Sequence, residues 1–183
     1  MSKKTIAIIE ANGDRGSAIA RKLAHTGNRL LFFAHEPGQL TSLVKTIRAQ
    51  APNANIASVY CPADASWEAD IIVSTIALDE NEEIKTKIAS FSNRKILIDA
   101  SGNNNTVTVA GAIEKTKELQ RLLPAVKIVK LFNISFIDHE VNTQGLIVGN
   151  DKESLVVVDK LWKEGTQDKL QLVDYSNFLE KIS

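Results

Sequence analysis

The chain has 183 residues, of which 44% are hydrophobic, and its 22 basic residues balance its 22 acidic residues. This length favours a single domain with a substantial core, and the balanced charge argues against a general affinity for nucleic acid or anionic membranes. No apolar stretch reaches the length of a membrane-spanning helix and the first residues show no signal-peptide pattern, so we expect a cytoplasmic protein.

The most informative segment is a predicted strand, glycine turn and helix at residues 5–16. Residues 6–9 (Ile-Ala-Ile-Ile) form an apolar run typical of a strand covered on both faces. Gly13 and Gly16 stand where the second and third glycines of G-x-G-x-x-G would stand, before an apolar helix face. Because a helix N-terminus offers unpaired N–H groups and a partial positive charge, this turn suits a pyrophosphate.

The glycine motif is incomplete at its start. Ala11 replaces the first glycine, and the acidic residue Glu10 precedes it. Gly13 is expected to let the backbone approach the phosphates, and Gly16 to let the helix pack closely on the strand. Glu10 either faces the phosphates and weakens binding, or turns away and pairs with Arg15 or another cation.

Strands and helices alternate through the rest of the chain. In chain order, the patterns predict strands at 29–34, 56–60, 70–75, 95–99 and 127–132, helices at 38–50, 80–91 and up to 123, and two late strands at 145–148 and 170–173 around a helix at 152–162. Cys61 and Pro62 are expected in a loop, residues 103–109 fit either a loop or the start of an element, and Trp67 and Trp162 are expected to pack. The alternation predicts an α/β fold, a doubly wound and mostly parallel Rossmann-like sheet in one domain.

In such sheets, ligands bind outside the carboxyl ends of the strands, where the strand order reverses. This rule selects the first turn and four later strand ends. They are residues 10–16, 34–36, 74–76, 99–102 and 132–134.

Three polar residues in the first turn and at these strand ends each allow two interpretations. Glu36 lies 20 residues after Gly16, so it either accepts the 2′-hydroxyl of an NAD ribose or is solvated. His35 either touches an adenosine phosphate or lies on the surface. Arg15, inside the turn, is either a cation near the phosphates or an exposed residue of the first helical turn.

No other group of residues in the sequence points to catalysis, and the sequence identifies no catalytic residue. The three histidines show no metal-binding spacing, so no metal site is predicted. Tyr60 and Tyr175 are followed four residues later by Asp64 and Leu179, not by the lysine of short-chain dehydrogenases. Asp99 is either a base or, more commonly at a strand end, a turn-forming acid. Cys61 is read as a bystander thiol.

Three segments together resemble one family. They are the turn at 10–16, the strand end Val73-Ser74-Thr75-Ile76, and Val129-Lys130-Leu131-Phe132-Asn133-Ile134. The chain is similar to the NADP oxidoreductase family of the coenzyme F420-dependent type, whose bacterial members are often called predicted dinucleotide-binding proteins. These proteins commonly show G-G-T-G-x-x-G after the first strand and V-K-A-F-N-T late in the domain. Residues 149–153 also resemble a late turn of the family, so the likeness spans about residues 4–175.

The resemblance implies a Rossmann-like domain over residues 1–183, without the C-terminal helical extension that many members use for dimer contacts. It implies binding of NADP or NAD, with a deazaflavin or flavin as a further partner. The family's usual reader of the 2′-phosphate is replaced by Ala34-His35, followed by Glu36, which leaves the choice of cofactor open. The residues predicted to bind the cofactor are Ala11, Asn12, Gly13, Asp14, Arg15, Gly16, His35, Glu36, Thr75, Ile76, Ala77 and Asn133.

The favoured function is therefore hydride transfer between a nicotinamide dinucleotide and a small or flavin-like acceptor. Two alternatives stay open: a non-catalytic or degenerate dinucleotide-binding sensor, which Glu10 favours, and an atypical NADP binder of the short-chain dehydrogenase type. We expect a small-molecule or flavin-like partner, no nucleic acid and no membrane; a homodimer is compatible with the family.

Overall fold

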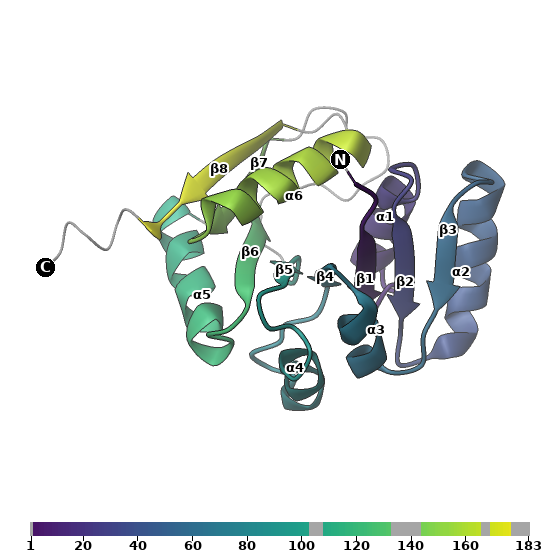
Figure 1. Ribbon diagram of the computed structural model, residues 1–183, viewed down its shortest axis with the longest axis horizontal. Helices are drawn as coiled ribbons and strands as arrows, with labels where there is room; N and C mark the ends of the chain where they lie inside the picture. Colours follow the sequence, from purple (N-terminus) through teal and green to yellow (C-terminus); the bar gives the residue numbers. More distant parts are fainter. Residues whose placement is uncertain (1, 103–107, 133–143, 166–168, 177–183) are drawn as a thin grey trace, which may run out of the picture.

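The computed structural model describes residues 2–102, 108–132, 144–165 and 169–176. Within these residues the chain forms the predicted α/β fold, an eight-stranded sheet with helices on both faces (Figure 1). The elements are β1 (Thr5–Ile9), α1 (Asp14–Leu23), β2 (Arg29–Phe33), α2 (Pro37–Gln50), β3 (Asn55–Ser58), α3 (Pro62–Glu68), β4 (Ile71–Ser74), α4 (Glu82–Ala89), β5 (Ile96–Asp99), α5 (Val109–Leu122), β6 (Lys127–Phe132), β7 (Gln144–Gly149), α6 (Lys152–Gly165) and β8 (Lys169–Asp174).

The strand order is β3-β2-β1-β4-β5-β6-β7-β8. The first six strands run parallel, β7 is antiparallel to β6, and β8 is parallel to β7. The order reverses between β1 and β4, because the chain first moves outward to β2 and β3 and then returns to the other side of β1. A crevice at the carboxyl ends of β1 and β4 is the expected ligand position in this topology.

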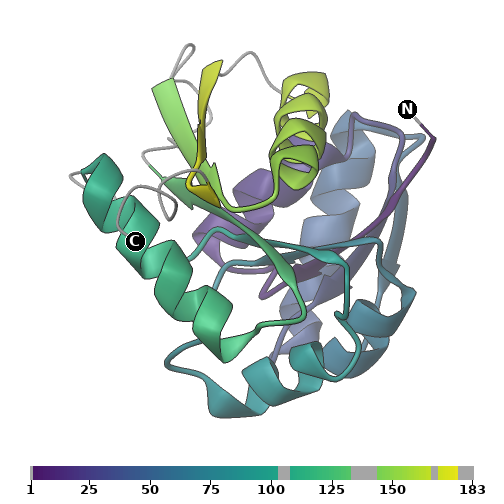
Figure 2. The same ribbon diagram turned by 60° about the vertical axis from the view of Figure 1, so that its left-hand side comes forward.

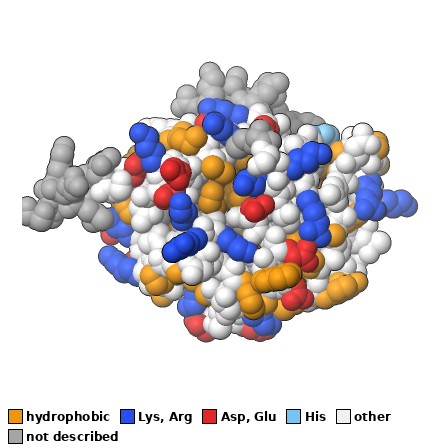
Figure 3. All heavy atoms as spheres, in the orientation of Figure 1, with side chains coloured by type: hydrophobic (Ala, Val, Ile, Leu, Met, Phe, Trp, Pro, Cys, Tyr) orange, Lys and Arg blue, Asp and Glu red, His pale blue; other side chains and the backbone are white. Residues whose placement is uncertain are grey.

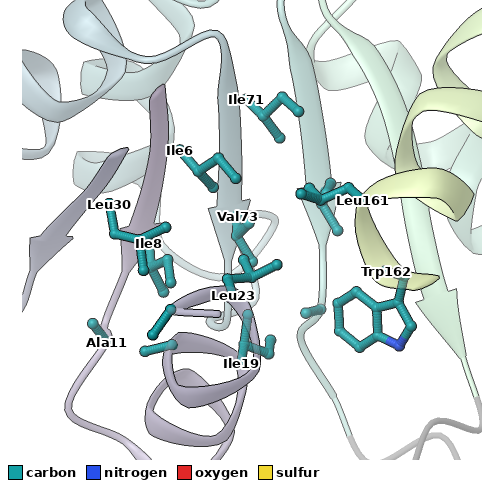
Figure 4. Packing of buried hydrophobic residues seen from close by; sticks show 14 of the residues in the cluster. Ile6, Ile8, Ala11, Ile19, Leu23, Leu30, Ile71, Val73, Leu161 and Trp162 are labelled. Atoms are coloured by element: carbon teal, nitrogen blue, oxygen red, sulfur yellow. The ribbon is translucent and has the colours of Figure 1, made fainter. Parts of the chain in front are cut away.

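Helices α1, α2 and α6 cover one face of the sheet and α3, α4 and α5 cover the other, as Figure 2 shows. Alternate residues of each central strand serve the two faces: Ile6 and Ile8 pack with Ile19 and Leu23 of α1, whereas Ile9 packs on the opposite face. Figure 4 shows the first cluster extending to Trp162 of α6, which is 1% exposed. Burial on both faces explains why these strands read as continuous apolar runs.

One helix, α3, was not predicted from the sequence. Pro62 begins α3, whereas Cys61 and Pro62 were expected in a loop. This helix buries only small residues, Ala65 and Ser66 besides Pro62, so no apolar stripe marks it in the sequence. Trp67, its largest side chain, is 69% exposed, so the prediction that Trp67 packs was wrong.

The segment 103–109, which the sequence left between a loop and the start of an element, is described in part. Val109 begins α5, and the hydroxyl of Thr108 caps this helix by accepting a hydrogen bond from the backbone N–H of Gly111 at 3.2 Å. Residues 103–107 lie outside the described residues.

Basic and acidic side chains are interspersed over the face shown in Figure 3, in keeping with the balanced composition. In the described parts of the chain, no helix has both the length and the apolar character needed to cross a bilayer.

Candidate functional site

A cleft of about 480 Å³ opens at the carboxyl ends of β1, β2 and β4. It therefore lies at the reversal of strand order, where the topology places a ligand. Its lining residues are Glu10, Asn12, Gly13, Asp14, Arg15, Gly16, His35, Gln39, Thr75, Ile76 and Asn81.

The N-terminus of α1 faces this cleft. Gly13 is the N-cap residue, and the first intrahelical bond runs from the N–H of Ser17 to the carbonyl of Gly13 at 2.8 Å. The N–H groups of residues 14–16 precede this bond and lie at the open end of the helix. They and the helix dipole give this end of the cleft a positive potential suited to a phosphate group.

The two glycines of the turn, Gly13 and Gly16, have different surroundings. A Cβ at Gly16 would lie 2.2 Å from the carbonyl oxygen of Glu10 and 2.8 Å from the Cα of Ala11, so glycine is needed for α1 to pack on the turn. A Cβ at Gly13 would have a single neighbouring atom within 4 Å, the carbonyl oxygen of Glu10 at 3.7 Å. Gly13 thus borders free space in the cleft, whereas Gly16 serves packing.

Glu10 turns toward β2 instead of pairing with Arg15. Its backbone is in the left-handed region (φ 59°), which non-glycine residues adopt infrequently. Its carboxylate accepts a hydrogen bond from the backbone N–H of His35 at 3.0 Å and also contacts Nδ1 of the His35 ring. Glu10 therefore lines the cleft while its carboxylate is held at the end of β2, so it combines features of the two arrangements expected for it.

A chain of side-chain hydrogen bonds runs from Asn12 through Gln39 to Glu36, and its first two members line the cleft. Asn12 Nδ2 donates to Gln39 Oε1 at 3.0 Å, and Gln39 Nε2 donates to Glu36 Oε2 at 2.6 Å. Asn12 Oδ1 is shielded from solvent and accepts no hydrogen bond from the residues that the structure describes.

Thr75 fixes the end of β4 to the turn after β1. Its hydroxyl donates to the carbonyl of Ile9 at 2.9 Å and contacts the carbonyl of Glu10 at 3.1 Å. Ile76 lines the cleft next to it, whereas Ala77 is half-buried and is not among the lining residues.

Arg15 lines the cleft but reaches across to the end of β5. Its guanidinium donates to the carbonyl of Ala100 at 2.6 Å and to that of Gly102. Burial lowers the pKa of Arg15, and the nearby Asp99 carboxylate opposes this effect. It is therefore not the exposed first-turn residue of the alternative interpretation, and its described contacts are with backbone carbonyls of the β5 loop.

Asp99 forms a turn at the end of β5, which was the more common of the two roles expected for it. It accepts a hydrogen bond from the N–H of Ser101 at 2.9 Å. It also forms a buried ion pair with Lys130, its direct neighbour on β6; the two side chains are 3% and 9% exposed. Neither residue lines the cleft.

The remaining predicted residues divide as follows. Ala11 is fully buried beneath the turn, where its N–H donates to the carbonyl of Phe33 at 2.9 Å. Glu36 is exposed at the N-cap of α2 and is outside the cleft lining. Asn133 lies outside the described residues.

Two lining residues, Gln39 and Asn81, were missed. Asn81 carries a sequence signal, since it caps α4 by accepting from the N–H of Ile84 at 3.1 Å. Gln39 carries none, because its place depends on how α2 packs beside the turn.

The described residues hold no cluster of three or more His, Cys, Asp or Glu side chains that could bind a metal ion.

Comparison with known families decides which group the chain resembles. The family model described as "NADP oxidoreductase coenzyme F420-dependent" matches residues 5–103, more than half of the chain. The chain belongs to this family. The match includes β1, the turn, β2 and β4, the elements that form the cleft. No curated protein matches the chain.

Solved structures share the fold of this F420-dependent NADP oxidoreductase family member. A structure from Arthrobacter sp. FB24, described as an F420-dependent NADP reductase, is 20% identical with a TM-score of 0.70; the match covers 97% of this chain and 88% of that one. Pyrroline carboxylate reductase from Plasmodium falciparum, solved with NADP bound, is 15% identical with a TM-score of 0.65, covering 97% of this chain and 60% of that one. An imine reductase variant from Myxococcus stipitatus, solved with NAD+, is 15% identical with a TM-score of 0.68, covering 99% of this chain and 59% of that one.

Proposed function

We propose that the chain binds a nicotinamide dinucleotide in the cleft at the turn of residues 10–16 and supports hydride transfer to or from a small or flavin-like acceptor. The observation that carries this proposal is the N-terminus of α1 opening into a cleft at the reversal of strand order. Membership of an NADP oxidoreductase family supports it.

The described residues fit such a cofactor. The free space at Gly13 gives phosphate oxygens access to the N–H groups at the start of α1. Asn12, whose amide is bonded to Gln39, lines the same cleft. The bound dinucleotide would supply the hydride chemistry itself, and the protein would supply binding, orientation and a suitable electrostatic field.

Hydride transfer of this kind needs no protein nucleophile, which agrees with the cleft lining. Its acidic and basic members are Glu10, Asp14, Arg15 and His35, and among them Glu10 is bonded to His35 while Arg15 is bonded to carbonyls. Thr75 and Arg15 brace the ends of β4 and β5, where the nicotinamide would lie in this topology.

A second candidate is a dinucleotide-binding module without catalysis. One observation favours it: Glu10 brings a carboxylate into the cleft where the family usually has glycine. The family match to the F420-dependent oxidoreductases removes support from the third interpretation, a binder of the short-chain dehydrogenase type.

Calorimetric titration of the purified chain with NADH and NADPH tests the proposal. We expect saturable binding of at least one of them with a micromolar dissociation constant. Anaerobic oxidation of the bound cofactor by a flavin or deazaflavin, followed by absorbance at the nicotinamide band, then separates the enzyme from the module. No heat of binding with either dinucleotide would refute both candidates.

A further inference from the structure

We propose that Glu10, and not Glu36, is the acid that reads the adenosine ribose, and that it makes this site select NAD over NADP. The inference rests on the proposed function, because it assigns specificity within the same cleft.

The position of the Glu10 carboxylate is the first argument. In dinucleotide-binding sheets, the acid that accepts the ribose 2′-hydroxyl lies at the carboxyl end of β2. Glu10 belongs to the turn after β1, yet its carboxylate is bonded to the backbone N–H of His35, two residues after the end of β2. The left-handed backbone of Glu10 and the side-by-side pairing of β1 with β2 bring it there.

The carboxylate is also held in place more firmly than a surface acid. The Glu10 side chain is 18% exposed, and the contact with the His35 ring adds to the bond from the His35 N–H. The His35 ring in turn packs edge-on against Phe33, with ring centroids 5.6 Å apart. A fixed acceptor of this kind can form two hydrogen bonds with the vicinal hydroxyls of an NAD ribose.

Glu36 is differently placed. It is exposed at the start of α2, lies outside the cleft lining, and accepts a hydrogen bond from Gln39. Gln39 in turn holds Asn12. The structure therefore gives Glu36 a positioning role, in which it orients Gln39 and Asn12 instead of contacting the ribose.

The charges around His35 disfavour a 2′-phosphate, which carries between one and two negative charges at neutral pH. Glu10 contacts His35 from the turn after β1, and Glu36 follows His35 in the chain. Glu83, on α4, lies near His35. The pKa of Glu83 is lowered chiefly by its hydrogen bond with Lys87 and, to a lesser extent, by His35. The guanidinium of Arg15, the arginine of the cleft lining, is directed to the β5 loop.

The test measures dissociation constants of NADH and NADPH for the wild type, Glu10→Gln and Glu36→Gln. We expect the wild type to prefer NADH by about tenfold or more, equivalent to 1.4 kcal/mol. Glu10→Gln should reduce that preference by about tenfold, because the amide oxygen still accepts from His35 while the repelling charge is gone. Glu36→Gln should leave the preference within about a factor of two.

Glu10→Asn is a second variant, because asparagine tolerates the left-handed backbone and also removes the charge. Circular dichroism establishes that each variant is folded. A wild type that prefers NADPH, or a preference lost in Glu36→Gln but kept in both Glu10 variants, would overturn this inference alone. Failure of the wild type to bind either dinucleotide would overturn the proposed function and the inference with it.

Discussion

Substitution of Gly13 by valine is expected to weaken dinucleotide binding by at least about two orders of magnitude. The added side chain would occupy the free space beside the N-terminus of α1, which the pyrophosphate needs in order to reach the helix N–H groups. Titration of the variant with NADH and NADPH measures the loss. Binding that is unchanged in Gly13→Val would mean that the dinucleotide lies elsewhere.

This variant should stay folded. The backbone of Gly13 is extended (φ −66°, ψ 164°), a conformation that valine favours, and its Cβ would make only ordinary contact with the carbonyl of Glu10. We expect an unchanged far-UV circular dichroism spectrum and a loss of unfolding free energy below about 1 kcal/mol, the typical cost of a poorer N-cap residue.

Gly16→Ala is the matched contrast in the same turn. Its methyl group would collide with the backbone of Glu10 and Ala11, so the turn or the helix must move. We expect a loss of about 3 kcal/mol in the free energy of unfolding, the upper part of the usual range for overpacking. A Gly16→Ala protein as stable as the wild type would contradict the close packing of α1 on the turn.

Replacement of Lys130 by methionine is the second large effect. It would leave the Asp99 carboxylate buried without its ion-pair partner. Loss of one member of a buried pair typically costs 3–5 kcal/mol, and we expect about 3 kcal/mol here because the Ser101 N–H and the nearby Arg15 still stabilise the carboxylate. Urea unfolding of the variant measures this difference.

The double variant Asp99→Asn with Lys130→Met tests whether the unpaired charge of Asp99 causes the loss of stability in Lys130→Met. Asparagine removes the uncompensated charge and keeps an acceptor for the Ser101 N–H, so the double variant should be more stable than Lys130→Met alone. If the two variants are equally destabilised, the uncompensated charge of Asp99 is not the cause of the loss.

Much of the fold could be predicted because it depends on local patterns. The apolar runs of β1, β2 and β4 are visible in the sequence since each strand is buried on both faces. The helix α3 was missed because it buries small residues and exposes Trp67. Pro62 at its first position was the available signal, since proline is common there.

The site was predictable in outline only. The glycine motif correctly located the turn, and Gly16 has the packing role expected of it. The direction of the Glu10 side chain depends on a left-handed backbone and on the neighbouring end of β2, and neither is encoded by spacing along the chain. The same holds for Arg15, whose partners Ala100 and Gly102 come from a strand end far along the sequence.

A crystal structure of the chain with NADH bound would show directly whether the dinucleotide lies in this cleft. We expect electron density for the pyrophosphate within hydrogen-bond distance of the N–H groups of residues 14–16, and for the adenosine ribose beside Glu10. Density for the dinucleotide outside the cleft of Glu10, Gly13 and Thr75, or none at a saturating concentration, would contradict this expectation.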